Sequence, residues 1–228
     1  MRYSEYQMEQ TVGQFMQKVY GWMSFALAMT AAVAYYISTT DFFLKLVANP
    51  LLLMVIVLAE LGLVVFISAA IQKIDYSTAV IAYMTYAFLN GVTLASVFFI
   101  YTEASIYSTF LTTAGMFAAL SIYGYFTKAD LTSVGSISFM VLIGLIIAQF
   151  VNMFFRSAQF EYMISFIGVI VFSLLTAYDV QKIKRLYMQL YGSGQNLSKV
   201  ALLGALTLYL DFINLFLFLL RLLGRRRD

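Results

Sequence analysis

Long apolar stretches alternate with short polar segments along almost the whole chain. Seven of these stretches are long enough to cross the hydrocarbon core of a bilayer, which takes about 20 residues of helix. Lipid offers no hydrogen-bonding partners to the backbone, so apolar spans of this length are helices rather than open strands. The pattern therefore predicts an all-α integral membrane protein with seven transmembrane helices, at residues 19–37, 51–71, 79–100, 107–126, 134–155, 162–180 and 200–223.

The polar segments between the predicted spans are too short to fold as a separate soluble domain, and the longest of them is 181–199. The polar residues 1–18 precede a full-length first span without an evident small-residue cleavage site, so we interpret this span as a retained helix rather than a signal peptide. We predict three parts: a polar N-terminal segment at 1–18, a seven-helix transmembrane domain at 19–223 and a basic C-terminal tail at 224–228.

Composition agrees with a membrane protein and removes several classes of function. The chain is 62% apolar and 11% charged, with a mean hydropathy of +0.87, whereas soluble domains are about half apolar and a quarter charged. It contains no Cys and no His, which excludes disulfides, Cys/His zinc sites and a Ser-His-Asp triad. The net charge is only +3, and no stretch resembles a basic nucleic-acid surface. We therefore expect no enzyme, no bound cofactor and no nucleic-acid partner.

The distribution of positive charge gives a weak indication of orientation. With seven spans, eight Lys and Arg residues fall on the face of the N terminus and six on the other face. This favours a cytoplasmic N terminus, but the run Arg225-Arg226-Arg227 pulls the other way and can equally rest on anionic headgroups. The sequence leaves the orientation open.

Four charged side chains lie inside predicted spans: Glu60, Asp179, Asp211 and Arg221. An ionised group at mid-bilayer costs about 2.5–3.5 kcal/mol on insertion scales, so such residues are candidates for a functional site. Asp211 is the clearest case because it lies well inside the last span, with Asn214 on the same helical face. The alternative is a structural acid that is hydrogen-bonded to a neighbouring helix.

Asp179 lies near the end of the sixth predicted span. Lys182 follows at i+3, so an ordinary interfacial ion pair is an equally good interpretation, and Thr176 is placed one turn earlier to donate a hydrogen bond. Asp179 is only about 4–5 Å inside its span, whereas Asp211 is about 13 Å inside its own. The two acids therefore reach one depth only if the sixth helix is tilted or continues past Lys182.

Glu60 lies midway along the second span and needs either a proton or a cation. Arg221 is the nearest unassigned cation by depth, unless it snorkels to the interface. Asn90, like the other polar residues within spans, more often holds helices together than binds a ligand. We expect the glycines, including Gly91, Gly115, Gly144 and Gly168, to permit close helix packing.

Two long motifs near the C-terminal end resemble the Bax inhibitor-1 family, also called the transmembrane Bax inhibitor motif family. They read FIGVIVFSL at 166–174, leading into Tyr178-Asp179, and ALTLYLDFINLF at 205–216, continuing to Arg221. The segments YGWM at 20–23 and FLNGVTL at 88–94 are similar to the bacterial inner-membrane branch of this family. The resemblance covers nearly the whole chain and is most specific from 166 to 221.

The resemblance implies a fold, a location and a site. The fold has two three-helix layers around a central last helix, in the bacterial inner (plasma) membrane. The family is associated with a pH-sensitive calcium leak in which two aspartates sense protons; by motif position these are Asp179 and Asp211, which would also hold calcium transiently. A helix–helix ionic contact in the family corresponds to Glu60 and Arg221.

The chain departs from the family at one point. Bacterial relatives have an arginine at the end of the second helix that latches the sixth-helix aspartate, whereas this sequence reads Ala70-Ile71-Gln72-Lys73. Lys73 supplies a point charge but lacks the bidentate geometry of an arginine. Whether Lys73 replaces this latch is left open.

The leading hypothesis is a pH-sensitive calcium (cation) leak channel, gated by the aspartate pair, whose partners are the lipid bilayer, calcium and protons. The alternative is a regulatory membrane protein that binds a membrane protease or another membrane complex without carrying ions. A third hypothesis is a proton-coupled transporter that uses Glu60, Asp179 and Asp211 as a relay. Saturable uptake driven by a pH gradient would distinguish the transporter from a leak.

Overall fold

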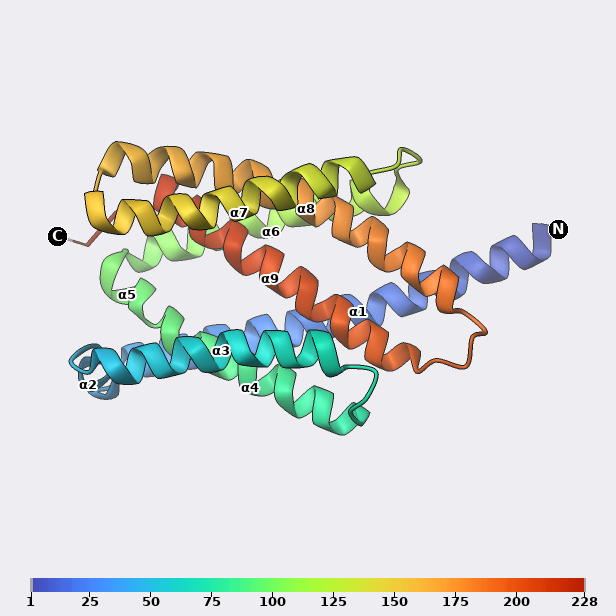
Figure 1. The fold of residues 1–228 in the computed structure, drawn as a ribbon, viewed down its shortest axis with the longest axis horizontal. Helices are drawn as coiled ribbons and strands as arrows, with labels where there is room; N and C mark the ends of the chain where they lie inside the picture. The colour runs from blue at the N-terminus through green and yellow to red at the C-terminus, as the bar shows by residue number, and fades with distance from the viewer. Residues whose placement is uncertain (1, 228) are drawn as a thin grey trace. The chain divides into compact units, whose positions relative to one another are not determined.

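The computed structural model describes the backbone of residues 2–227 and the side chains of residues 10–46 and 48–227. The side chains of 1–9, within the predicted N-terminal segment, and Asp228, in the predicted tail, lie outside the described residues. Within the described range every long regular element is a helix (Figure 1). The helices are α1 (Arg2–Ser38), α2 (Phe42–Val47), α3 (Pro50–Ala70), α4 (Tyr76–Leu94), α5 (Ser96–Ile100), α6 (Glu103–Phe126), α7 (Thr132–Phe155), α8 (Ala158–Leu190) and α9 (Leu197–Leu223).

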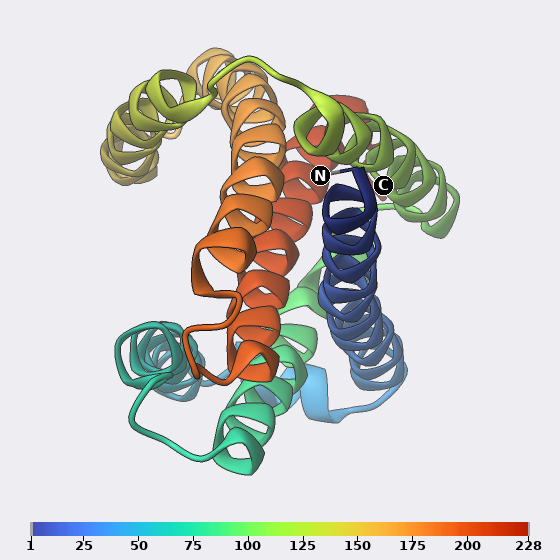
Figure 2. The same ribbon diagram turned by 90° about the vertical axis from the view of Figure 1, so that its right-hand side faces the viewer.

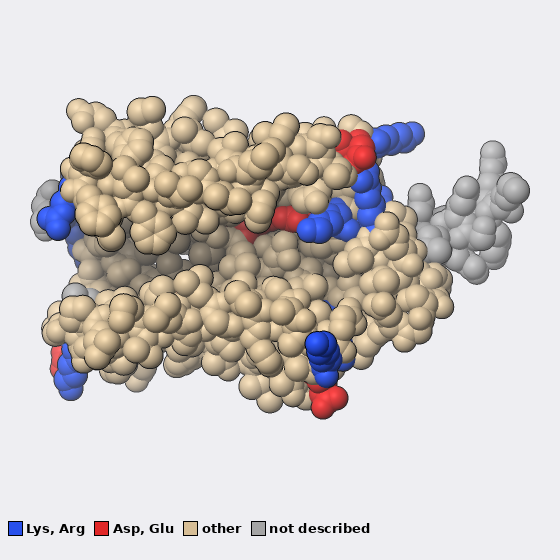
Figure 3. All heavy atoms as spheres, viewed as in Figure 1, with Lys and Arg blue, Asp and Glu red and all other residues tan. Residues whose placement is uncertain are grey.

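The prediction of an all-α protein with seven spans is confirmed. Seven segments in the described range are long and apolar enough to cross a membrane. Six of them are single helices, and the third comprises α4 and α5, which are separated at Ala95. Most of the face drawn in Figure 3 is free of charged side chains, as expected for helices whose exposed apolar side chains face lipid.

Local sequence explains where several helices begin and end. Asn49 Oδ1 accepts a hydrogen bond from Leu52 N at the start of α3, where Pro50 fits the first turn. The Thr102 hydroxyl accepts from Ser105 N at the start of α6. Helix α7 ends at Arg156, which has a left-handed backbone with a φ of 49°. These capping groups satisfy backbone donors and acceptors that the helix leaves unpaired.

Helix α8 is much longer than the hydrophobic pattern predicts. The predicted span ends at residue 180, but α8 continues without a break to Leu190 (Figures 1 and 2). The predicted connection 181–199 is therefore wrong, since only residues 191–196 join α8 to α9. The extension is amphipathic: Ile183 and Tyr187 are buried, whereas Lys182 is exposed. Mean hydropathy falls in such an amphipathic segment, so a hydropathy pattern places the end of the span there although the helix continues.

The described chain forms two compact units. The first contains residues up to Ile100, Tyr187–Tyr209 and Arg227, and the second contains Tyr101–Leu186 and Leu210–Arg226. Helices α8 and α9 contribute to both units. Helix α9 is the most buried of the seven spans, with 72% of its apolar segment inside the protein, compared with 6% for α3.

Each unit has its own apolar core. In the first unit the core is formed by Ile37, Phe43, Leu46, Val92 and Ala95. In the second it is formed by residues of α7, α8 and α9: Leu145, Ile164, Val171, Phe172, Leu175, Leu215, Phe218 and Leu219. Apart from Ile164, the α8 and α9 residues of this second core lie within the two motifs that carry the family resemblance or directly after them.

Close helix packing depends on glycine at only some of the predicted positions. A side chain at Gly91 would collide with Val33 and the Thr30 carbonyl, and one at Gly168 would collide with the Phe218 ring. Gly115 and Gly144 instead face open space, so the predicted packing role is wrong for these two. Gly124, which the sequence did not single out, lies directly against the Ala177 carbonyl and permits the close approach of α6 to α8.

Candidate functional site

Helices α8 and α9 bring Asp179 and Asp211 together in the second unit. Their carboxyl groups interact electrostatically, and the two residues are only 7% and 5% exposed. Two ionised carboxylates are both acceptors, so a hydrogen bond between them requires a shared proton. The arrangement is therefore a buried pair of acids, one on α8 and one on α9.

The extension of α8 brings the two acids closer to one depth. Leu190, at the end of α8, lies about 16 Å beyond Asp179, and Leu197, at the start of α9, lies about 21 Å before Asp211. The short connection 191–196 reverses the chain between these helices. The continuation of α8 past Lys182 therefore leaves a difference of about 5 Å, one helical turn, between the two distances from the turn.

Cationic charge reaches the pair from one side. Lys182 Nζ lies 4.0 Å from Asp179 Oδ1, but the lysine side chain is 60% exposed and that of Asp179 only 11%. The interfacial ion pair proposed from sequence is thus present together with the contact to Asp211. Such a long, exposed pair contributes little to stability. Asp211 Oδ2 is buried and has no hydrogen-bond partner among the described residues.

Two predicted neighbours do not serve the pair. The Thr176 hydroxyl donates to Phe172 O in its own helix at 2.7 Å rather than to Asp179. Asn214 Nδ2 likewise donates to Leu210 O at 2.8 Å. Both side chains donate a hydrogen bond to the backbone carbonyl one turn earlier in their own helix, as polar residues in membrane helices commonly do. The expected help from Thr176 is therefore absent.

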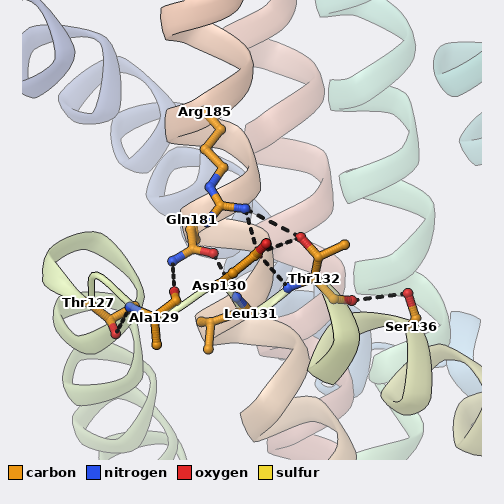
Figure 4. A network of polar contacts seen from close by, with 8 residues as sticks. All are labelled: Thr127, Ala129, Asp130, Leu131, Thr132, Ser136, Gln181 and Arg185. Carbon is orange, nitrogen blue, oxygen red and sulfur yellow. Dashed lines mark hydrogen bonds and ion pairs between the residues drawn. The ribbon is translucent and has the colours of Figure 1, made fainter.

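A polar latch fixes the segment of α8 just beyond Asp179 (Figure 4). The Gln181 amide accepts from Leu131 N at 3.0 Å and donates to Ala129 O at 2.8 Å, so one side chain spans the α6–α7 connection. Arg185 Nη1 lies 2.7 Å from Asp130 Oδ1. We call Gln181, Arg185 and residues 129–132 the α8 latch. The latch provides hydrogen-bond partners for Gln181 and Arg185, which the hydrophobic pattern placed in a connection between helices.

Asp130 is the acidic member of the latch and lies outside the membrane-spanning segments. Hydrogen bonds from the Thr132 hydroxyl, Arg185 and Thr132 N hold the pKa of Asp130 well below its usual value. A lowered folded-state pKa gives a stabilising contribution that is present above the unfolded pKa of about 3.9. This contribution is lost only as the pH falls from there toward the folded pKa. Asp130 therefore stays ionised at neutral pH.

We expect Asp130→Ala to release the latch locally. Thr132 N loses its acceptor Asp130 Oδ1 and Arg185 loses its counter-ion, so amide hydrogen exchange in residues 129–132 should become faster at neutral pH. The matched control is Asp75→Ala, because Asp75 precedes α4 without a side-chain cap hydrogen bond. The latch would be contradicted if Asp130→Ala left amide exchange in residues 129–132 unchanged. It would also be contradicted if Asp75→Ala accelerated exchange in these residues as much as Asp130→Ala does.

Glu60 lies in a separate polar network in the first unit. It is 9% exposed and accepts from Thr93 Oγ1 at 3.1 Å and from Asn90 Nδ2 at 3.5 Å. Asn90 Oδ1 in turn accepts from Tyr209 OH at 3.0 Å, and Tyr209 OH lies 2.7 Å from Thr30 Oγ1. The network joins α3, α4, α9 and α1. Asn90 thus holds helices together, as expected, whereas Tyr209 was missed.

Arg221 belongs to the second unit, where its guanidinium carbon lies 5.4 Å from the centre of the Phe218 ring. This distance is typical of a cation–π contact. Glu60 belongs to the first unit, and its ionic contact with Arg221 stays a prediction, as does the substitution of Lys73 for the missing arginine.

The metal-binding capacity of the site is limited. In the part of the chain that the structure describes, no three His, Cys, Asp or Glu side chains converge as a metal cluster. Calcium prefers six to eight oxygen ligands, and the pair supplies carboxylate oxygens from two residues. Two residues alone supply fewer ligands than a stable calcium site requires.

Seven membrane-spanning helices with a buried acid pair on the last two define a multi-pass membrane protein, and comparison with known proteins places it among its relatives. The family model described as "Inhibitor of apoptosis-promoting Bax1" matches residues 12–228. The chain belongs to this family, the Bax inhibitor-1 family, as the motifs indicated.

Bacterial relatives match over nearly their whole length. The inner membrane protein YbhL of Escherichia coli K12 is 48% identical over 215 residues, which cover 93% of this chain and 92% of that protein. An uncharacterized protein of Borreliella burgdorferi is 46% identical, with 94% and 93% covered. An uncharacterized membrane protein of Streptococcus pyogenes is 37% identical, with 94% and 93% covered. The predicted multi-pass location in the inner membrane is confirmed.

Proposed function

We propose that this protein is a passive, pH-sensitive cation leak, with calcium as the ion, and that the Asp179–Asp211 pair controls it. The observation that supports the proposal most strongly is the burial of two interacting carboxyl groups, Asp179 on α8 and Asp211 on α9. Such a pair titrates as a unit, since the charge on one acid changes the proton affinity of the other.

The shared proton ties α8 to α9. When it is lost, two negative charges face each other in a buried site, and the contact between the helices must change. Asp211 Oδ2, which has no protein donor, offers a hard oxygen ligand of the kind calcium prefers. Change in the α8–α9 contact and exposure of carboxylate oxygens to a cation are thus two results of one titration.

The alternative of a regulatory protein that binds a membrane protease or other complex has less support. The basic tail at 224–228 is a candidate segment for such contacts. The tail is held to the protein at several points: the backbone N–H of Arg225 donates to Ser105 Oγ at 2.9 Å, and the Arg226 guanidinium lies 3.8 Å from Glu161 Oε1. Arg227 donates to Phe98 O at 2.9 Å. A docking tail would have to leave these contacts first.

The proposal is tested with purified protein in vesicles that contain calcium, sodium or potassium. Efflux is compared over about pH 5–8, where folded proteins are generally most stable, for the wild type and Asp179→Asn. We expect calcium efflux from the wild type to depend on pH and this dependence to be lost in Asp179→Asn. Inert vesicles together with a stoichiometric co-purifying protein would favour the regulatory alternative instead.

A further inference from the structure

The network around Tyr209 has more contacts than its hydroxyl protons can serve. Thr30 Oγ1 lies 2.8 Å from Ala87 O and 2.7 Å from Tyr209 OH, and Tyr209 OH lies 3.0 Å from Asn90 Oδ1. All three distances are those of good hydrogen bonds. The two hydroxyl groups carry one proton each, so two protons face three contacts. With Asn90 oriented in this way, one contact must lack a hydrogen.

Turning the Asn90 amide by half a rotation resolves this deficit. The amide presents an oxygen on one side and two N–H donors on the other, and the exchange places the donors toward Tyr209. Tyr209 then donates to Thr30, and Thr30 donates to Ala87 O, so each contact has its own proton. The amide oxygen of Asn90 now faces Glu60. That contact is a hydrogen bond only when Glu60 itself carries a proton.

The ionised form of Glu60 requires the opposite direction. Asn90 Nδ2 then donates to Glu60, as it does over 3.5 Å, and Tyr209 donates to Asn90. The single Thr30 proton is divided between Tyr209 and Ala87 O. The chain of contacts thus has two donor directions, and the charge on Glu60 selects between them.

We propose that Glu60 is a proton-binding site separate from the aspartate pair, whose occupancy reverses hydrogen-bond donation along Asn90, Tyr209 and Thr30. The surroundings of Glu60 in its unit suit a neutral acid. Helix α4, which packs on α3, carries no charged residue, and the phenols of Tyr86 and Tyr209 are the titratable groups on which Glu60 acts electrostatically.

The remaining neighbours of Glu60 supply no counter-ion within the first unit. Helix α2 also packs on α3, and its one charged residue, Lys45, is exposed. Thr93 Oγ1 lies 3.1 Å from Glu60 Oε1 and 3.0 Å from Asn90 O, so its one proton is divided between these two acceptors in either charge state of Glu60. In the described residues of this unit, hydrogen bonds rather than ion pairs hold Glu60.

The consequence of this site reaches α9. Tyr209 lies two residues before Asp211 on the same helix, so a proton on Glu60 changes how α9 is held close to the aspartate pair. That consequence for the leak rests on the proposed function, whereas the proton site does not. The test therefore uses a readout that is independent of ion flux.

The test is difference infrared spectroscopy of the full chain in detergent, over about pH 5–8, which detects protonated carboxyl groups directly. We expect Glu60→Gln to remove one protonated-carboxyl band. Tyr209→Phe and Thr30→Val should shift the frequency of this band, because each removes a hydroxyl from the chain of contacts. The control Tyr107→Phe, at a tyrosine that is 66% exposed, should leave it unchanged.

Two results would overturn the proposal. The first is a carboxyl spectrum that Glu60→Gln leaves unchanged, which means that Glu60 holds no proton. The second is a band that Arg221→Gln shifts while Tyr209→Phe and Thr30→Val do not, which means that the arginine sets the state of Glu60. Thr30→Val leaves Tyr209 in place, so it still tests the network if Tyr209→Phe does not fold. A sample with the band but no calcium leak would overturn the proposed function alone.

Discussion

Asp211→Asn is expected to abolish the pH dependence of calcium efflux from vesicles. The variant keeps the size of the side chain and can still hydrogen-bond to Asp179, but the pair no longer shares a titrating proton. The ratio of leak rates at the two ends of the range from about pH 5 to pH 8 should therefore fall to about one. The measurement is efflux of trapped calcium, followed with an external indicator.

A double variant sharpens this prediction. If Asp179 and Asp211 act as one unit, Asp179→Asn and Asp211→Asn are not additive, and the double variant should respond to pH as either single variant does. Asp75→Asn is the matched control, because Asp75 is an exposed acid outside the spans and its loss should leave the pH response intact. A wild-type pH response in Asp211→Asn would exclude the pair as the sensor.

Gly124→Ala is expected to destabilise the protein strongly, whereas Gly115→Ala in the same helix is not. A side chain at Gly124 meets the backbone carbonyl of Ala177, which cannot move aside as a flexible side chain could. Overpacking of this kind costs about 1–3 kcal/mol, which corresponds to a loss of about 2–12 °C in Tm for a chain of this size. Nothing lies within 4 Å of a side chain at Gly115.

Thermal unfolding of the two alanine variants in detergent tests this difference. Gly115→Ala should be neutral or stabilising by up to about 1 kcal/mol, since alanine favours helix more than glycine does. Equal Tm values for the two variants would show that α6 does not approach α8 as closely as the structure has it. Since α8 carries Asp179, a loosened Gly124→Ala variant should also change the leak.

Much of the fold follows from the hydrophobic pattern, and the main error has a clear cause. The seven spans are recognisable because lipid imposes long apolar helices. The end of α8 was misplaced because Gln181, Lys184 and Arg185 read as a polar loop. Their partners lie about 50 residues earlier: Lys184 Nζ, for example, donates to Tyr125 O at 2.9 Å. Hydrogen bonds between residues so far apart in sequence cannot be recognised from local hydropathy.

The acids of the candidate site could be found from sequence, but their partners could not. Asp211 stands out because charge inside a span is costly, while its contact with Asp179 came from the resemblance to the family. Nothing in the sequence indicated that Tyr209 belongs to a hydrogen-bond network, since tyrosines in membrane helices usually pack or mark the interface. Its role depends on Asn90 and Thr30, which come from α4 and α1, and only the fold brings the three together.

The central claim is that protonation of the Asp179–Asp211 pair governs the passage of ions, and a rapid pH jump on calcium-loaded vesicles tests it most directly. The wild-type protein should change its leak rate after the jump and return to the first rate when the pH is restored, whereas the double variant Asp179→Asn/Asp211→Asn should show one constant rate. A folded wild-type sample that keeps its vesicles sealed at every pH, or that leaks at a rate the jump does not change, would contradict the claim.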